Sequence, residues 1–163
     1  MPGNAVIRRA ASGDVAALAG LVREYWAFEG IDGFDEPACR RVLGDFLADG
    51  SAGLAWIADD GDRAVGYLLA CFVFSLEHGG RTAEVDELFV VPAWRGRGLG
   101  ARLLATAEAA FEAAGLSSVS MQVGTGNPAA ARFYARHGYA PREGYRLMDK
   151  QLAVHRTRRP GPG

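Results

Sequence analysis

The sequence is short of lysine, cysteine and histidine. Lys150 is its one lysine, and the other basic side chains, apart from three histidines, are arginines. We read this bias as a property of the genome and expect a bacterial protein. Cys39 and Cys71 are too few for a disulfide framework, which favours a reducing compartment. The histidines are scattered without the spacing of metal ligands, so we expect no metal site.

Long hydrophobic runs and an excess of one charge are also missing. No stretch approaches the roughly 18–20 consecutive apolar residues that cross a membrane, and the N-terminus lacks the apolar core of a signal peptide. The formal net charge is −1, so no positive field attracts nucleic acid. We therefore expect a cytoplasmic protein whose partners are neither membranes nor nucleic acids.

What the chain does have is the composition of an ordinary globular domain. Its 163 residues are 49% hydrophobic and 23% charged, and this length suits a single domain. We place that domain at residues 1–155. Residues 156–163 carry no apolar side chain apart from proline, so we expect a disordered tail. A twofold homodimer is the default expectation, because it is the commonest soluble assembly.

The stretch 84–104 organises the rest of the chain. Leu88 to Val91 suit a buried strand, and Pro92 ends it because proline has no N–H for a ladder. A glycine turn follows, and apolar residues then recur at helical spacing from Leu99 onward. The first N–H groups of a helix are unpaired and lie at the positive end of its dipole. The stretch therefore predicts a site for a phosphate group.

Known glycine-rich phosphate loops differ in what surrounds their glycines. A P-loop needs Lys-Ser/Thr after its last glycine, whereas Gly100 is followed by Ala101 and an arginine. A dinucleotide-binding turn fits Gly96-x-Gly98-x-x-Ala101, but it needs an acid at the end of the next strand. The strand predicted at 119–123 has none. Both loops, and with them a nicotinamide oxidoreductase, are disfavoured.

A third form, Arg/Gln-x-x-Gly-x-Gly/Ala, is met by Arg95, Gly98 and Gly100. In this run the sequence resembles the GCN5-related N-acetyltransferase (GNAT) family, whose members bind the pyrophosphate of acetyl-CoA on such a loop. Two looser patterns, at residues 126–134 and 136–139, agree with the family in their spacing. The resemblance covers about residues 5–153.

The predicted order of elements also agrees with that family. Periodicity and turn residues predict the order β-αα-βββ-α-β-α-ββ. The resemblance implies an α/β fold of the α+β type, with a mixed, mostly antiparallel sheet of six to seven strands. It also implies about four helices and two splayed central parallel strands. The strands are expected near residues 5–10, 54–58, 64–74, 84–91, 119–123, 139–141 and 145–154, and the helices near 15–28, 36–49, 99–114 and 128–137.

The resemblance assigns acetyl-CoA, as a co-substrate, to particular residues. Its pantetheine arm is expected along the backbone of Leu88, Phe89 and Val90, with the Leu88 N–H as a candidate oxyanion donor. Asn127 precedes Pro128 and is predicted to cap a helix, and the resemblance also places Asn127 beside the cofactor. The pyrophosphate loop comprises Arg95, Gly96, Arg97, Gly98, Leu99, Gly100 and Ala101.

Two kinds of catalytic residue are expected. Tyr134 falls where the family places a tyrosine that protonates the leaving thiolate; the alternative is a tyrosine of the core. Acids on the strand leading into the cofactor are candidate bases, and alternation places Glu84 and Asp86 on one face and Glu87 on the other. We favour Asp86 and then Glu84 as the base. The alternative is a solvated or arginine-paired strand end.

These expectations combine into a function. We expect an N-acetyltransferase that moves the acetyl group of acetyl-CoA to a primary amine by direct attack in a ternary complex. The alternative is a non-catalytic protein of the same fold that binds an acyl-CoA or an effector. Residues 24–36 contain five acids, four aromatic residues and no basic residue, which favours a small cationic amine or a peptide amine as acceptor. That segment equally suits a solvated helix end.

Overall fold

The structure is a computed structural model that describes residues 4–153. Within these residues the chain forms four α-helices and five β-strands, and it divides into two compact units. The first unit, Met1–Gln122, holds the sheet and three of the helices. The second, Val123–Gly163, holds the fourth helix and the segment after it. The expected single domain at 1–155 stays a prediction.

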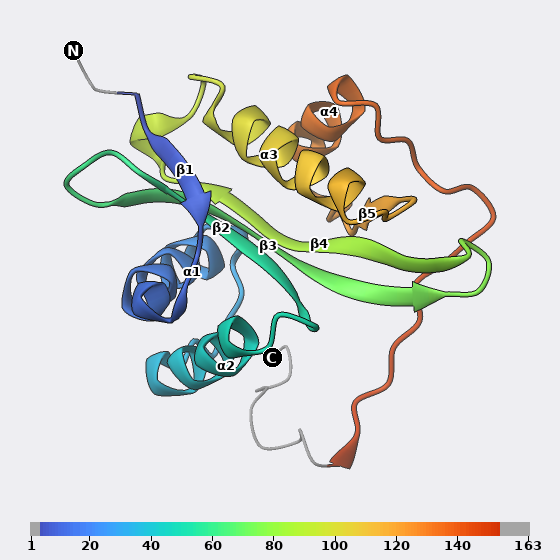
Figure 1. The fold of residues 1–163 in the computed structure, drawn as a ribbon, viewed down its shortest axis with the longest axis horizontal. Helices are drawn as coiled ribbons and strands as arrows, with labels where there is room; N and C mark the ends of the chain where they lie inside the picture. Colours follow the sequence, from blue (N-terminus) through green and yellow to red (C-terminus); the bar gives the residue numbers. More distant parts are fainter. Residues whose placement is uncertain (1–3, 154–163) are drawn as a thin grey trace. The chain divides into compact units, whose positions relative to one another are not determined.

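The first unit is built on one mixed sheet in the order β1-β2-β3-β4-β5. Neighbouring strands are antiparallel except for β4 and β5, which are parallel (Figure 1). β4 and β5 pair over only three residues each and then part, as the expected splay requires. The strands are β1 (Val6–Arg9), β2 (Gly53–Asp59), β3 (Ala64–Ser75), β4 (Gly80–Val90) and β5 (Val119–Met121).

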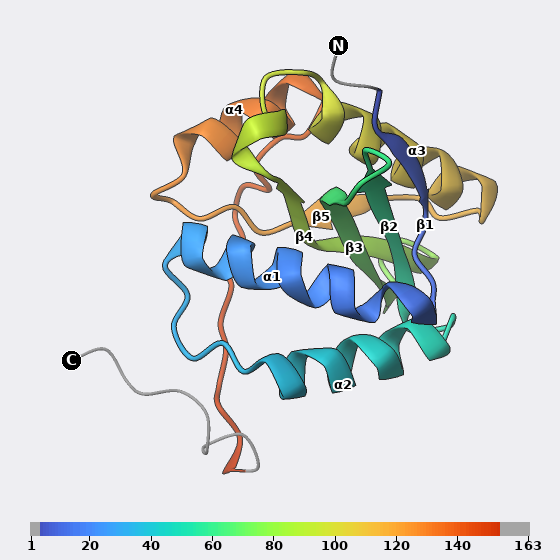
Figure 2. The ribbon, with the colours of Figure 1, turned by 90° about the vertical axis from the view of Figure 1, so that its left-hand side faces the viewer.

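Helices cover both faces of this sheet. α1 (Val15–Glu29) and α2 (Glu36–Ala48) lie on one face, and α3 (Leu99–Ala113) lies on the other (Figures 1 and 2). β3 runs through the middle, which explains why its first half is apolar without alternation. Two layers of helix against one sheet bury apolar side chains on both of its faces.

Side chains from both helical layers form the core. Trp56 of β2 packs edge-on against Phe111 of α3, with ring centroids 5.7 Å apart. Leu18 of α1 and Leu103 of α3 are fully buried on opposite sides of the sheet. Burying such side chains contributes about 1.5–3 kcal/mol each. The apolar face predicted from Leu99 onward is therefore the face of α3 that packs.

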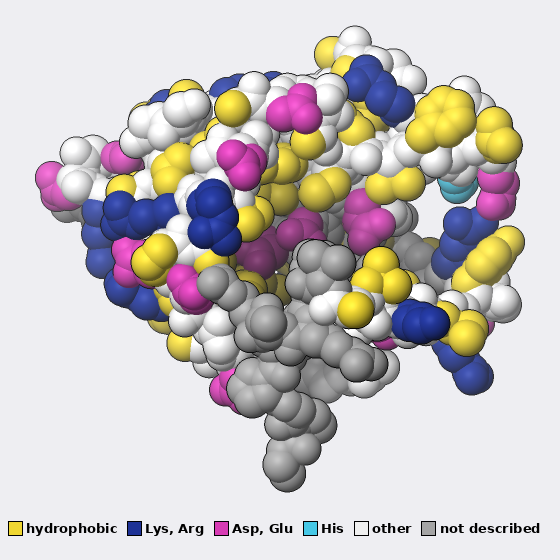
Figure 3. Space-filling model, turned by 90° about the horizontal axis from the view of Figure 1, so that it is seen from below, with side chains coloured by type: hydrophobic (Ala, Val, Ile, Leu, Met, Phe, Trp, Pro, Cys, Tyr) yellow, Lys and Arg dark blue, Asp and Glu magenta, His cyan; other side chains and the backbone are white. Residues whose placement is uncertain are grey.

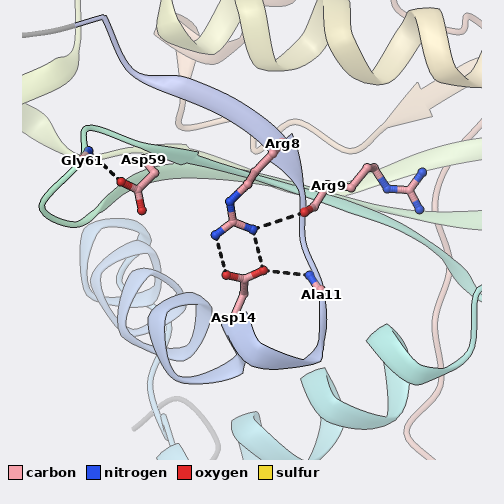
Figure 4. A network of polar contacts seen from close by, with 6 residues as sticks. All are labelled: Arg8, Arg9, Ala11, Asp14, Asp59 and Gly61. Atoms are coloured by element: carbon pink, nitrogen blue, oxygen red, sulfur yellow. Dashed lines mark hydrogen bonds and ion pairs between the residues drawn. The ribbon is translucent and has the colours of Figure 1, made fainter.

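A charged clamp fixes the first strand to the first helix. Arg8 of β1 donates two hydrogen bonds to the carboxylate of Asp14, at 2.8 and 2.7 Å (Figure 4). The same carboxylate accepts the N–H of Ala11 at 2.8 Å, and Arg8 also reaches the carbonyl of Arg9. The Arg8 guanidinium lowers the pKa of Asp14. Asp59 lies near Arg8 in Figure 4 and accepts the N–H of Gly61, in the turn after β2.

The second unit contains α4 (Pro128–Arg136) and differs from the prediction after it. The closing strands expected at 139–141 and 145–154 are wrong as far as the structure describes them, because residues 139–153 form no strand. Extended apolar sequence makes a strand only where a neighbouring strand completes its ladder. The described sheet thus has five strands, not six to seven. Val154 and the predicted tail at 156–163 lie outside the described residues.

Candidate active site

The turn after β4 opens α3 with two left-handed glycines. Gly96 has φ 73° and Gly98 has φ 75°, a region that other residues enter only with strain. A Cβ built on either glycine would meet no atom within 4 Å, so the space in front of the turn is open. Glycine is therefore required here by backbone conformation, and the open space leaves room for a ligand.

The N-terminus of α3 keeps its first N–H groups for an outside partner. The first helical hydrogen bond runs from the N–H of Arg102 to the carbonyl of Gly98, at 3.0 Å. The N–H groups of Leu99, Gly100 and Ala101 therefore lie ahead of the helical ladder. No side chain caps this helix, and its first turn carries no acid to compete with a bound anion.

The arginines of the turn are held by aromatic rings. Arg95 donates from Nε to the carbonyl of Val90 at 2.9 Å, and its guanidinium lies 4.3 Å from the ring centroid of Phe28 and 5.4 Å from that of Phe89. The guanidinium of Arg97 lies 5.3 Å from the ring centroid of the neighbouring tryptophan, Trp94. Arg95 thus joins the start of the loop to the last turn of α1.

The expected pantetheine residues lie on the part of β4 that β5 does not pair. Leu88, Phe89 and Val90 pair with β3 on one side, opposite Leu68, Tyr67 and Gly66. On the other side, β5 pairs with β4 only from Ala83 to Val85. From residue 86 onward, this edge of β4 is therefore not paired with β5. An extended chain could add to β4 there.

A β-bulge changes which acids share a face. Glu87 pairs with Leu69 and Val85 pairs with Ala70, so Asp86 is an extra residue between them. Glu84 pairs with Cys71, two residues along β3 from the partner of Glu87. Glu84 and Glu87 consequently point to the same face, and the predicted alternation is wrong across the bulge.

This acidic face lies on the side of α1 and α2. Seen from that side, acidic side chains gather near the middle of the face (Figure 3). Within the described residues no arginine or lysine pairs with Glu84, Asp86 or Glu87, and Glu84 accepts a hydrogen bond from Gln122 at 3.2 Å. The expected alternative of an arginine-paired strand end thus has no support among the described residues.

Glu87 is the most firmly held of these acids. Its two carboxylate oxygens accept hydrogen bonds from the hydroxyl of Tyr67 at 2.5 Å and from Nε1 of Trp26 at 3.2 Å. Burial raises the pKa of Glu87, and the two hydrogen bonds oppose that rise. Asp86 is exposed to solvent, but the protein atoms around its carboxylate partly desolvate it. This desolvation and the negative charge of Glu84 both raise the pKa of Asp86. Carboxylates with raised pKa values are suited to accept and hold a proton near neutral pH.

Sequence reasoning missed Trp26 and Tyr67 as partners of this site. They lie 61 and 20 residues from Glu87 along the chain. For Trp26 the available signal is the aromatic content of residues 24–36, which suggests an acceptor site but no partner on β4, and Tyr67 lies outside that segment. Trp26 also packs edge-on against Phe34, at 5.8 Å between centroids, so the segment after α1 is tied to Glu87 through one indole.

Asn127 and Tyr134 belong to the second unit and are described within it. The side chain of Asn127 accepts the N–H of Ala130 at 3.1 Å, so the predicted helix cap is present. Tyr134 is half-buried between Phe133 and Tyr139, at 5.2 and 5.7 Å between ring centroids. Burial raises the pKa of Tyr134 to about 12, so its hydroxyl keeps its proton at neutral pH.

The described residues contain no group of three or more side chains arranged to hold a metal ion. Among the same residues, no helix has the length and apolar character to cross a membrane.

Comparison with known proteins decides the family. Residues 17–139 match the family model described as acetyltransferase (GNAT) family, which is most of the chain. The chain belongs to the GNAT acetyltransferase family. Among solved structures, an integron cassette protein from a salt-marsh metagenome is 30% identical, with a TM-score of 0.79 over 90% of each chain. The GNAT fold predicted from the sequence is confirmed.

The matches to curated relatives cover about half of this GNAT chain, less than the match to the family model. An aminoalkylphosphonate N-acetyltransferase of Salmonella typhimurium is 35% identical over 47% of this chain and 50% of its own length. An IAA acetyltransferase of Azospirillum brasilense is 32% identical over 49% of this chain and 52% of its own length. The chain thus spans about half the length of the curated relatives it matches. An aminoglycoside N-acetyltransferase in complex with CoA shares the fold, at TM-score 0.78 and 18% identity over 93% of this chain and 99% of its own.

Proposed function

We propose that this protein is an acetyl-CoA-dependent N-acetyltransferase that acts on a cationic primary amine. The observation that carries the proposal is the uncapped start of α3, with left-handed Gly96 and Gly98 before it and open space in front. Backbone N–H groups from Gly96 to Ala101 suit the pyrophosphate of acetyl-CoA. The names of two curated relatives include acetyltransferase, and one acts on an aminoalkylphosphonate.

The rest of the cofactor would follow β4. Leu88, Phe89 and Val90 lie where β5 has left the strand, so their backbone groups can bond an extended pantetheine arm. Acetyl-CoA supplies an acetyl group activated as a thioester. The N–H of Leu88 would donate to the carbonyl oxygen as negative charge develops on it.

Two proton transfers complete the reaction. The attacking amine must lose a proton, and the acids of β4 are the candidates to accept it: Asp86 first, then Glu84, which shares its face with Glu87. The leaving thiolate must gain a proton, which the hydroxyl of Tyr134 would donate. Asn127 serves α4 as a cap, and a further contact with the cofactor remains part of this proposal.

The acidic face of β4 also guides the choice of acceptor. Acids that pair with no arginine or lysine in residues 4–153 can attract an ammonium group, and the indole of Trp26 lies beside one of them. Two acids of the segment after α1 already bond other groups of the chain. Asp35 caps α2 by accepting the N–H of Ala38 at 2.9 Å, and Glu36 pairs with Arg40 at 2.8 Å. We therefore assign the attraction of the acceptor to β4 more than to that segment.

A screen of amines tests the proposal. The protein is mixed with acetyl-CoA and a panel of polyamines, basic amino acids, aminoglycosides and peptides, and released thiol is measured with a chromogenic reagent. We expect turnover with cationic amines and lower kcat/KM for anionic ones. Tight binding of acetyl-CoA without turnover on any amine would instead support the non-catalytic acyl-CoA-binding alternative.

A further inference from the structure

The side chain of Arg95 is held on the α1 side of the sheet. Its Nε donates to the carbonyl of Val90 at 2.9 Å, which fixes the guanidinium beside β4. The guanidinium lies over the rings of Phe28 and Phe89, at 4.3 and 5.4 Å from their centroids. Phe28 belongs to α1, which covers one face of the sheet, whereas α3 covers the other (Figures 1 and 2). The rings that hold Arg95 thus belong to the side opposite the helix that its turn opens.

Phe28 lies where α1 ends. Gly30 follows with φ 67°, and the N–H of Ile31 bonds the carbonyl of Trp26 at 2.8 Å, which closes the helix. Phe28 is 57% exposed. A guanidinium can stack on such a ring while its own N–H groups stay in water. Arg95 therefore covers part of an exposed ring at the last turn of α1 and ties that turn to the end of β4.

The same turn of α1 also holds the acids of β4. Trp26 lies two residues before Phe28, and its Nε1 donates to the carboxylate of Glu87 at 3.2 Å. Trp26 further packs edge-on against Phe34 in the segment after α1. Residues of one helical turn are joined by the helix backbone and shift together. A displacement of Phe28 would therefore also displace the indole that bonds Glu87.

We propose that Arg95 is a positioning residue for the acceptor side of the site. Through Phe28 it fixes the last turn of α1, and through Trp26 that turn fixes Glu87. The inference rests on the proposed function, because it takes the acids of β4 as the groups that attract the amine. The pyrophosphate is left to the backbone N–H groups of the turn and of α3. Loss of the Arg95 side chain should therefore weaken binding of the amine more than binding of CoA.

Amide hydrogen exchange of the full chain tests the contact without cofactor or amine. Phe28→Leu and Arg95→Met should each speed exchange at residues 28–31 about 3–10-fold, the scale of one cation–π contact. The double variant should exchange no faster than Phe28→Leu alone, because both changes remove the same contact. Arg81→Met is the matched control: the Arg81 guanidinium lies 4.8 Å from the ring centroid of Phe72, and its loss should leave residues 28–31 unchanged. Additive effects, or exchange equal to that of the wild type, overturn the proposal.

Ligand affinities separate positioning from a charge that binds the pyrophosphate. Calorimetry gives Kd for CoA, and kinetics give KM for the amine of highest kcat/KM in the panel above. Arg95→Met and Arg95→Lys should both keep Kd for CoA within about threefold and raise KM for the amine about 3–10-fold, since lysine keeps the charge but lacks the planar face. CoA affinity that falls about tenfold or more in Arg95→Met and recovers in Arg95→Lys would make Arg95 a ligand of the pyrophosphate and overturn the proposal.

The two measurements also separate this inference from the proposed function. If no amine in the panel turns over, the proposed function fails, and the exchange result still decides whether Arg95 fixes the end of α1. If amines turn over while exchange and KM in the variants match the wild type, this inference fails and the proposed function stands. Circular dichroism of each variant must match the wild type. If Arg95→Met does not, Arg95→Lys takes its place in the exchange measurement and should show the same faster exchange.

Discussion

Helices α3 and α4 both begin after a turn that contains glycine, but their first turns are built differently. α3 follows Gly98 at φ 75° without a side-chain cap. α4 follows Asn127, whose side chain accepts the N–H of Ala130 at 3.1 Å, and Pro128 fills its first position. The chain supplies the acceptor that α4 needs and supplies none from a side chain to α3.

The difference separates a helix start that serves stability from one that suits a ligand. α2 resembles α4, because Asp35 accepts the N–H of Ala38 at 2.9 Å. A side-chain cap contributes about 1 kcal/mol, so leaving α3 uncapped forgoes stability of that order. A pyrophosphate bound at α3 would supply the missing acceptors. Substitutions at the two helix starts should therefore separate binding from stability.

The largest effect is expected at Gly98. Gly98→Val places a β-branched side chain at φ 75°, where it is strained, and fills the open space before α3. We expect acetyl-CoA binding to be lost, as measured by calorimetry. Binding as tight as that of the wild type would show that the anion does not bind at this turn.

Gly115 provides a matched control for Gly98→Val. It has φ 77° just after α3, and a Cβ there also meets no atom within 4 Å. Gly115→Val should cost similar stability and keep acetyl-CoA binding. If both variants lose binding, backbone strain alone explains the result and the comparison between helix starts fails.

The next effect is expected at Tyr134 in α4, whose side chain is proposed to act in catalysis. Tyr134→Phe removes one oxygen and little volume. If Tyr134 is the general acid, kcat should fall about 10²–10³-fold with near-normal acetyl-CoA affinity. Tyr145→Phe is the control, because Tyr145 is 68% exposed and has no assigned role in catalysis. An unchanged kcat in Tyr134→Phe would mean that Tyr134 has a structural role only.

Local signals account for what could be predicted. Some features depend only on residues close to them in the sequence, so the sequence alone predicts them. These are the glycine turn, the caps Asp35 and Asn127, and the apolar run of β3. The order of these elements agreed with that of the GNAT family, and the resemblance to the family implied the fold class. The predicted backbone contacts of the cofactor loop stay predictions.

Non-local pairing accounts for what could not be predicted. The bulge at Asp86 depends on how β4 meets β3, and no glycine or proline marks it, so alternation misplaced Glu87. The hydrogen bonds from Trp26 and Tyr67 to Glu87 join residues that are distant in sequence. The closing strands failed for the same reason, since a strand needs a partner that its own residues do not specify.

A smaller effect is expected at the capped helix start. Asn127→Ala should lower stability by about 1 kcal/mol, which is a shift of Tm by roughly 2–4 °C for a chain of this size. Asn127→Asp keeps an acceptor for the N–H of Ala130 and should restore most of that loss. Because a contact of Asn127 with the cofactor is part of the proposed function, Asn127→Ala should also weaken acetyl-CoA binding. Unchanged acetyl-CoA affinity in Asn127→Ala would leave Asn127 with the helix cap alone.

The smallest effect is expected at Asp14, just before α1, whose charged side chain bonds the chain ahead of the helix and does not cap the helix itself. Asp14 bonds Arg8 and the N–H of Ala11, and Arg8 lowers its pKa in the folded chain. The stability from Asp14 is therefore present above the pKa of the unfolded chain, about 3.9, and is lost as the pH falls through the folded pKa. The side chain of Arg8 is 47% exposed, so solvent limits the gain to about 1 kcal/mol or less. Asp14→Asn should lower Tm at neutral pH, and the difference from the wild type should shrink in acid. Asp62→Asn, in the turn after β2, is the control and should change Tm little at either pH. If the Asp14→Asn difference is the same at both, shape and not charge makes this start stable.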